Sequence, residues 1–515
     1  MLAHLMSHKA EITPNRSMSF FAILAILMII ASYVFVILLA AACVLLPYYV
    51  LHRTESPGFG IVVLFLFGVA IAAAMLWSLI PQRDKFKPPG PLLDRASHPR
   101  LFAEIDGIAA ALDEPLPDEV YLTAEVNAWV TDRGGLMGSE SRRVMGLGVP
   151  LLSILTVSQF RAVLAHEFAH YYGGDTRLGP WVYKTQKTLV RTFQNIGSLR
   201  EFTRIMVLYI MYRVVTALLQ GYFKLFLLAM NLVSRRKEYR ADELACLIAG
   251  TQSMIEGLRA IHACTPAWRG YWDTEVSPVV SNGSLPPIGE GFARFLAAPQ
   301  ISERVEQGLK KMIQTEKTSY YDSHPPLRKR IAAIEMLTGS LPPQDTRPAR
   351  ELLDNLKAAE RSLIAVLNPR LRADLQPVTW EEAGNKVLIP SWRGFVGKHS
   401  ALLAGITAET LPNAIPKLQE IGSKISDPKG MLLTRDQRTR RAEQLLAMSF
   451  GLMLVDHGWE VHSQPGSLYF QRGNDQLDVF LTVRDIVSKK TTLDDWVAKC
   501  QELGISRLQI SPGSG

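Results

Sequence analysis

Two long, uncharged apolar runs near the N-terminus constrain this chain more than any other feature. Residues 19–50 and 59–80 contain no Asp, Glu, Lys or Arg and are almost wholly apolar. A transmembrane helix needs roughly 20 such residues, so each run predicts a membrane span. A cleavable signal peptide is the alternative for the first run, but that apolar stretch is too long for one.

The Lys and Arg residues around these spans predict their orientation. Such residues precede the first span and follow the second, whereas the short loop between the spans carries only Arg53, beside Glu55. Lys and Arg are more frequent on the cytoplasmic side of membrane spans, so we expect both ends of this pair of spans on the cytoplasmic side of a bacterial inner membrane. We therefore expect the formal charge of +8 to interact with anionic lipid head groups rather than with nucleic acid.

Two proline-containing linkers divide the rest of the chain. "KPPGP" spans residues 87–91, and "SLPPQDTRPAR" spans residues 340–350. We therefore expect a membrane anchor with its linker at 1–91, a domain at 92–345 and a separate small α/β domain at 346–515. Four scattered cysteines without a C-x-x-C pair fit a reducing compartment and provide no cysteine-based metal site.

The stretch "RAVLAHEFAHYYGGD", residues 161–175, combines two histidines and a glutamate on a predicted helix. Thr156 or Ser158 can cap this helix, and apolar residues recur at helical spacing along it. His166 and His170 are one turn apart and share a face, so both rings can reach one zinc ion. Glu167 is rotated about 100° from His166, which lets it reach a water at the metal without being a ligand.

A five-residue pattern occurs by chance in many proteins, so a third ligand is needed. "SRRKEYRADELACLIAG", residues 234–250, provides one on a predicted helix that begins at Ser234. Glu238 and Asp242 are four residues apart and share a face. Glu238 would bind the metal, and Asp242 would accept the Nδ1–H of a ligating histidine. The alternative interpretation is a solvated acidic face beside arginines.

The two motifs, in this order, resemble the membrane-anchored zinc metallopeptidases that include HtpX and the type I CAAX prenyl proteases. Three more stretches are similar to that family: "VNAWV" at 126–130, Asp175 after the histidine helix, and "SHPPLRKRI" at 323–331. The resemblance covers about residues 92–337 and the two spans, and it implies a mainly helical α+β, zincin-like domain with a small β-sheet. The chain departs from the HtpX type in lacking two clear spans between His170 and Glu238.

The resemblance implies roles for the matching residues. His166, His170 and Glu238 would hold one Zn²⁺ per chain, with Glu167 as the general base. His324 and Arg330 would face the substrate and stabilise the oxyanion. A rigid turn entering a basic helix is the alternative for their segment. The sequence around the "VNAWV" stretch is rich in β-forming residues, so we expect Asn127, Ala128 and Trp129 on an edge strand that pairs with a protein or peptide substrate.

The apolar segment at 205–233 resembles a third span, but the topology argues against a single crossing. His170 precedes it and Glu238 follows it, so the chain between them crosses the membrane an even number of times. The residues before 205 include Arg191, Arg200, Glu201 and Arg204, a poor composition for a second span. We therefore expect an amphipathic helix that lies against the membrane without crossing it, or a buried helix of the catalytic domain.

The last third of the chain predicts structure but no function. We expect helices near 351–367, 440–456 and 493–503, and a hairpin in "SLYFQRGNDQLDVFLTV", residues 467–483.

The favoured interpretation of the whole chain is a membrane-bound zinc endopeptidase that acts on membrane or misfolded proteins. The alternative is a catalytically silent membrane adaptor that binds partners through the C-terminal domain. A nucleic-acid binder rests on the pI alone.

Overall fold

The computed structural model describes residues 16–80, 86–133, 142–172, 179–316, 324–337, 343–369, 375–425 and 433–511. The chain folds into two compact units that are interleaved in sequence. The first comprises residues 1–262 and 308–363, and the second comprises residues 263–307 and 364–515. The sequence predicts one boundary near 346, whereas here residues 263–307 pack with the C-terminal part of the chain.

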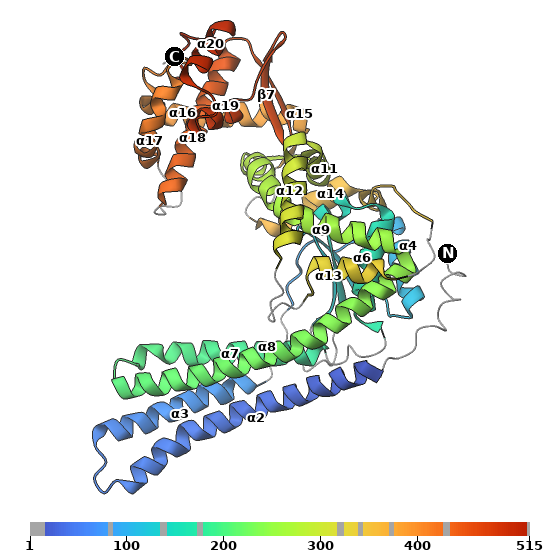
Figure 1. Cartoon of the computed structure of the whole chain (residues 1–515), viewed down its shortest axis with the longest axis vertical. Helices are drawn as coiled ribbons and strands as arrows, with labels where there is room; N and C mark the ends of the chain where they lie inside the picture. The colour runs from blue at the N-terminus through green and yellow to red at the C-terminus, as the bar shows by residue number, and fades with distance from the viewer. Residues whose placement is uncertain are drawn as a thin grey trace. The chain divides into compact units, whose positions relative to one another are not determined.

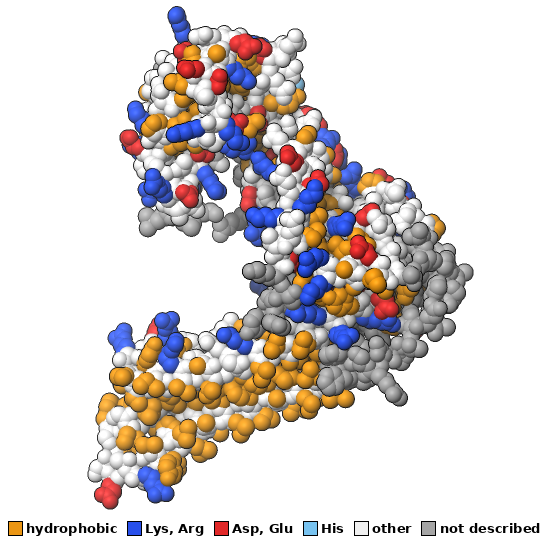
Figure 2. Space-filling view, in the orientation of Figure 1, with side chains coloured by type: hydrophobic (Ala, Val, Ile, Leu, Met, Phe, Trp, Pro, Cys, Tyr) orange, Lys and Arg blue, Asp and Glu red, His pale blue; other side chains and the backbone are white. Residues whose placement is uncertain are grey.

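Four long helices of the first unit lie side by side (Figure 1). They are α2 (Arg16–Arg53), α3 (Phe59–Leu79), α7 (Gly179–Gly197) and α8 (Met206–Ala249). Three of them, α2, α3 and α8, are long and apolar enough to cross a membrane. Large apolar side chains of these helices remain exposed, and Figure 2 shows them gathered over the bundle. A surface of this kind is stable against lipid tails rather than water.

Small residues and interhelical hydrogen bonds hold this bundle together. A Cβ added at Gly68 of α3 would lie 2.1 Å from the carbonyl oxygen of Cys43, so only glycine permits this approach to α2. The hydroxyls of Ser32 and Tyr222 are 2.9 Å apart and link α2 to α8. The hydroxyls of Ser78 and Thr192 are 2.6 Å apart and link α3 to α7. Such contacts are typical of helices that associate within a bilayer.

The segment expected at 205–233 differs from the prediction in two ways. It is part of the single helix α8, which continues through Ser234 to Ala249 without a break. It also forms a hairpin with α7 through the 3-10 turn η3 (Ser198–Phe202), and both arms pack on α2 and α3. The charges at 200 and 201 therefore lie in the turn, not within a span. Arg191 donates to the carbonyl of Ile80 at 3.2 Å, at the end of α3.

The part of the first unit outside the helical bundle surrounds a three-stranded sheet with the order β1-β3-β2. Its strands are β1 (Glu119–Thr123), β2 (Ala128–Arg133) and β3 (Arg142–Gly148). β1 pairs with β3 in parallel, and β2 pairs with β3 antiparallel. The helices of this part are α4 (Pro99–Leu112), α5 (Val149–Ile154), α6 (Val157–Ala169), α13 (Leu327–Glu335) and η5 (Ala349–Leu352). One apolar core joins them to the end of α8.

The second unit has its own core of aromatic and aliphatic side chains. Three helices each contain a boundary between the residue ranges of the two units: α9 (Thr251–Tyr271), α12 (Pro299–Thr315) and α14 (Leu356–Leu367). The second unit also contains η4 (Trp272–Val276), α10 (Ser277–Ser281), β4 (Ser284–Leu285), α11 (Ile288–Ala297), β5 (Gln376–Pro377), α15 (Trp380–Ala383), η7 (Gly384–Leu388), α16 (Ile389–Lys398), η8 (Ser400–Leu403), η9 (Leu411–Lys417), α17 (Leu418–Lys424), α18 (Arg435–Asp456), β6 (Glu460–Gln464), β7 (Ser467–Arg472), β8 (Asp475–Leu477), α19 (Val479–Val487) and α20 (Leu493–Glu502).

The expected hairpin at 467–483 is only half correct. β7 and β8 pair antiparallel, and β6 adds a third strand on the other side of β7. The second half of the expected strand is instead the helix α19. Asp478 caps it by accepting a hydrogen bond from the N–H of Leu481 at 2.9 Å, which favours a helix over a continued strand.

Candidate metal centre

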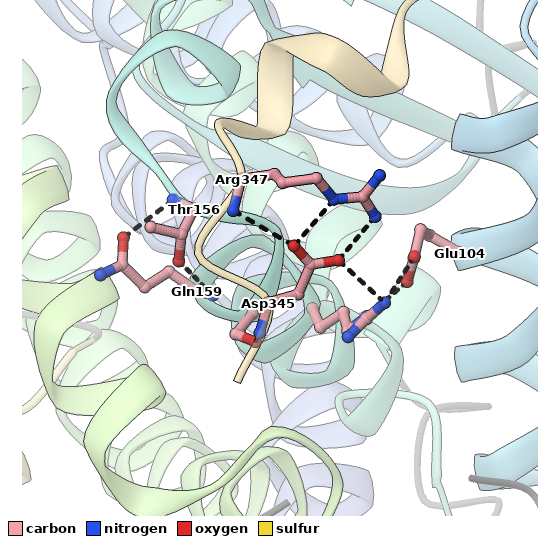
Figure 3. A network of polar contacts seen from close by, with 7 residues as sticks. Glu104, Thr156, Gln159, Asp345 and Arg347 are labelled. Carbon is pink, nitrogen blue, oxygen red and sulfur yellow. Dashed lines mark hydrogen bonds and ion pairs between the residues drawn. The ribbon is translucent and has the colours of Figure 1, made fainter. Parts of the chain in front are cut away.

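Contacts at its N-terminus hold the helix α6, which carries the two candidate histidines, in place. Thr156 and Gln159 form a reciprocal capping box, which Figure 3 shows. A segment that follows residue 342 supplies two further acceptors: Val157 N–H donates to the carbonyl of Arg347, and Ser158 N–H donates to that of Asp345. The first N–H groups of a helix have no partner within the helix, so these contacts hold α6 in place.

A chain of ion pairs extends this attachment (Figure 3). Arg161 of α6 donates to both carboxylate oxygens of Glu104 on α4, at 2.6 and 2.7 Å. Its guanidinium also lies 3.9 Å from Asp345, which in turn pairs with Arg347 at 2.7 Å. Glu104 and Arg161 are largely buried, so this pairing is more stabilising than an exposed one.

The histidines and Glu238 meet where α6 packs against α8. His166 Nε2 lies 3.6 Å from Glu238 Oε2, and His170 Nε2 lies 3.5 Å from Glu238 Oε1. Two ligand atoms that each lie about 2.1 Å from a tetrahedral zinc ion are about 3.4 Å from each other. The spacing between this carboxylate and both imidazoles therefore fits a shared metal ion.

Three further observations test whether these residues suit a metal. The Oε2 atom of Glu238 is buried where the three side chains converge and has no hydrogen-bond partner among the described residues, although the guanidinium of Arg330 lies 3.3 Å away. Burial lowers the pKa of His170 to about 3, which keeps that ring neutral as a metal ligand requires, whereas for His166 burial is outweighed by the hydrogen bonds to Asp242 and Glu238, which raise the pKa to about 9. His166, Glu167 and His170 also bring their ligand atoms within 4.8 Å of one another. The donor set of two imidazoles and one carboxylate suits zinc.

Asp242 lies behind this cluster, one turn after Glu238 on α8. Its Oδ1 atom is 3.0 Å from His166 Nδ1. A carboxylate at this position fixes the tautomer of the imidazole, so that Nε2 is the atom that faces the metal.

Arg330 of α13 lies deeper than expected. The sequence predicts a side chain that faces the substrate, but this guanidinium is buried and donates two hydrogen bonds to Asp242, at 2.6 and 2.9 Å. It also lies 3.3 Å from Glu238 Oε2. In this structure Arg330 therefore contacts both carboxylates of the centre and supports their orientation.

His324 approaches the same carboxylate from the solvent side. Its Nδ1 atom lies 2.9 Å from Glu238 Oε1, and 66% of the side chain is exposed. Glu316 fixes the start of α13 close to His324 by accepting a hydrogen bond from the N–H of Leu327 at 2.8 Å. The position of His324, beside the cluster and open to solvent, is compatible with contact to a substrate.

Glu167 has an environment suited to proton transfer. Burial raises the pKa of Glu167 to about 7. A positive charge on His166 lowers this pKa, and the negative charge of Glu238 raises it further. A carboxyl group with a pKa near neutrality can both accept and release a proton, which is the property of a general base that later acts as an acid.

The expected substrate strand lies at an edge of the sheet. β2 begins at Ala128 and contains Trp129, and its only partner among the described residues is β3. Asn127 precedes the strand, and its carbonyl accepts a hydrogen bond from the N–H of Gly148 at 3.0 Å. α6 packs against β2, so this edge lies close to the metal centre. Asp175 lies outside the described residues.

Sequence reasoning missed three contributors to this site. Arg161 is visible in the histidine stretch as a charge on an otherwise apolar helix, but its partner Glu104 is 57 positions away. The segment around Asp345 reads as a linker because it is rich in proline and polar residues. Tyr171 follows His170 directly and carries a hydroxyl that contacts β2. No short-range pattern identifies these three partnerships.

Comparisons with known proteins agree with this geometry. A family model described as peptidase family M48 matches residues 95–338. Protease HtpX of Xylella fastidiosa (strain 9a5c) is 28% identical over 193 residues, which cover 36% of this chain and 63% of that protein. Protease HtpX of Mannheimia succiniciproducens is 26% identical over 236 residues, which cover 43% and 67%. The chain thus spans just under two thirds of the length of the first of these relatives.

The crystal structure of S. mikatae Ste24p aligns with 61% of this chain and 66% of that one, at a TM-score of 0.26 and 16% identity. The family match is more specific, because its range contains all five candidate residues of α6 and α8 as well as His324 and Arg330. Residues 95–338 thus match the model of peptidase family M48 and are similar in sequence to the HtpX proteases.

Proposed function

We propose that this protein is a membrane-bound zinc endopeptidase. The observation that carries the proposal is the placement of one Glu238 carboxylate 3.5 and 3.6 Å from the Nε2 atoms of His170 and His166. These three residues would hold one zinc ion. When bound, zinc polarises a peptide carbonyl and lowers the pKa of a water molecule toward about 7.

The residues of the chain then divide the chemistry of peptide hydrolysis between them. Glu167 accepts the proton of the attacking water and returns it to the leaving amine, so its carboxyl group serves both steps. Asp242 holds His166 in the required tautomer, and Arg330 holds Asp242. His324, exposed beside Glu238, is positioned to donate to the oxyanion that develops on the substrate carbonyl.

The outer edge of β2 would bind the substrate backbone as an added strand. Asn127, Ala128 and Trp129 are the residues that we assign to this role, because β2 has one free edge and packs against α6. Strand addition binds an extended peptide through main-chain hydrogen bonds, which any unfolded segment can offer. A protease of this kind suits unfolded segments of membrane or misfolded proteins.

We further propose that the catalytic domain faces the cytoplasm of a bacterium, as the flanking charges predict. The α7–α8 hairpin packs along α2 and α3, which supports two crossings between His170 and Glu238 rather than none. Two crossings preserve the even number that a shared metal ion requires. A substrate within the membrane could then approach the centre along the bundle.

The Glu167→Gln substitution tests the proposal. The full-length protein purified in detergent should bind one zinc per chain and cleave denatured casein. The Glu167→Gln variant should keep the zinc, lose cleavage and retain bound protein substrates. Zinc-loaded parent protein that cleaves no protein substrate would favour the silent adaptor. A DNA or RNA titration at low salt should show no binding, in keeping with a charge that serves the lipid surface.

A further inference from the structure

The open edge of β2 presents the backbone groups of two residues that are two positions apart, Ala128 and Val130. Gly148 N–H donates to the carbonyl of Asn127, so the backbone of Asn127 faces β3. Backbone groups of an antiparallel strand alternate between its two sides. The register of β2 against β3 continues without a bulge, so the N–H and C=O groups of Ala128 and Val130 face the open edge.

Tyr171 reaches one of these two positions. Its hydroxyl donates a hydrogen bond to the carbonyl oxygen of Val130 at 2.9 Å. The ring is held in place by Arg143, whose guanidinium carbon lies 4.4 Å from the ring centroid. Since Tyr171 follows His170, this contact also ties the edge strand to the residue next to a candidate metal ligand.

We propose that Tyr171 sets which substrate N–H groups the edge strand can recognise. This inference rests on the proposed function, because it concerns a peptide bound to β2. The carbonyl of Ala128 accepts the N–H of one substrate residue. The carbonyl of Val130 is engaged by Tyr171, so the substrate residue two positions away has no acceptor for its N–H. Tyr171 is therefore a specificity-determining residue.

The consequence for substrates is a difference between two neighbouring positions. Proline or an N-methylated residue is excluded opposite Ala128 and accepted opposite Val130. The spacing of two residues holds for a substrate strand in either direction, because consecutive outward carbonyls of β2 are two residues apart. A protease with this selectivity tolerates a proline at one fixed distance from the scissile bond and rejects it two residues away.

The test is an N-methyl scan of a bound peptide. The probe is a fluorescent synthetic peptide that spans the first bond cleaved by the protein in denatured β-casein. Binding is measured by anisotropy with the zinc-loaded, full-length Glu167→Gln protein. One N-methylated position should weaken binding about fivefold, the effect of one neutral hydrogen bond, and the position two residues away should have no effect.

The Tyr171→Phe substitution in the same background should change this pattern. It frees the Val130 carbonyl, so the tolerant position should become sensitive by about the same factor, and the unmodified peptide should bind more tightly. Tyr172→Phe is the matched control, since Tyr172 is the neighbouring, half-buried tyrosine, and it should leave the pattern unchanged. Zinc content is measured for each variant to establish that the centre is intact.

Two outcomes would overturn the inference. A carbonyl oxygen has two lone pairs, so it could accept from Tyr171 and from the peptide together. In that event the parent protein would show two sensitive positions two residues apart, a result that needs no variant. An unchanged pattern in Tyr171→Phe would also reject the role. A parent protein that cleaves no substrate would instead reject the proposed function. A scan without any sensitive position would reject β2 as the strand that binds the substrate.

Discussion

Removal of the Arg330 guanidinium should strongly destabilise the protein, because this group contacts both buried carboxylates of the centre. The side chain of Arg330 is 7% exposed and that of Asp242 is 3% exposed, and two hydrogen bonds join them. The substitution Arg330→Met keeps the length of the side chain and deletes its charge. It leaves the carboxylate of Asp242 buried without its cation, next to the second buried carboxylate of Glu238.

The magnitude follows from the cost of an unpaired buried charge. Removal of one partner of a buried ion pair typically costs about 3–5 kcal/mol. For a domain of this size each kcal/mol lowers the melting temperature by about 2–4 °C, so Arg330→Met should lower it by about 6–20 °C. The double variant Arg330→Met with Asp242→Asn removes both charges and retains an acceptor for His166. It should be more stable than Arg330→Met alone, because no charge of the pair is left unmatched.

The assay is thermal unfolding of the full-length protein in detergent at saturating zinc, followed by intrinsic fluorescence at a fixed scan rate. Arg328→Met is the matched control, since Arg328 is on the same helix and exposed. It should leave the melting temperature unchanged. The reasoning would be refuted by a melting temperature of Arg330→Met equal to that of the parent, or by a double variant less stable than the single one.

Four further perturbations test other parts of the structure. Glu238→Ala should lose most of the bound zinc by metal analysis, and full occupancy would remove Glu238 from the ligand set. Ala128→Pro deletes an outward N–H of the edge strand and should reduce casein cleavage at unchanged zinc content. Asp345→Ala removes the carboxylate that pairs with Arg347 and lies 3.9 Å from Arg161, and it should lower the free energy of unfolding by about 1–3 kcal/mol. A variant as stable as the parent would show that this carboxylate does not stabilise the fold. In sealed vesicles, a single cysteine at Phe202 should be labelled from outside and one at Arg235 from the cytoplasm. Labelling of both from the cytoplasm would restore the helix that does not cross the membrane.

The candidate site was predictable where a single helix carries the pattern. His166, Glu167 and His170 are read from one turn of α6, and Glu238 and Asp242 are read from one turn of α8, because helical spacing fixes which side chains share a face. The membrane helices α2 and α3 were predictable from the absence of charge alone. In each case the interaction that decides the structure is local in sequence.

The parts that could not be predicted depend on contacts between distant segments. Arg330 and Asp242 are 88 positions apart, and only the packing of α13 against α8 places them together. The place of Arg200 and Glu201 could not be read from the sequence either, because only the fold shows that they lie in the turn η3 between α7 and α8. The strand expected at 479–483 was wrong because the capping of α19 by Asp478 outweighed alternating polarity.

The continuity of α8 links the dimensions of the bundle to the geometry of the candidate metal centre. Phe226 is buried in the bundle, and Glu238 is 12 positions further along the same helix, so about 18 Å of unbroken helix connect them. No loop is available along this length to absorb a change. A single inserted residue between these two points would turn Glu238 by about 100° away from the histidines. Because α8 is rigid, a change in its tilt within the bundle also moves Glu238, the proposed metal ligand. A bilayer that is too thick or too thin for the hairpin would therefore shift the carboxylate of Glu238 relative to the histidines.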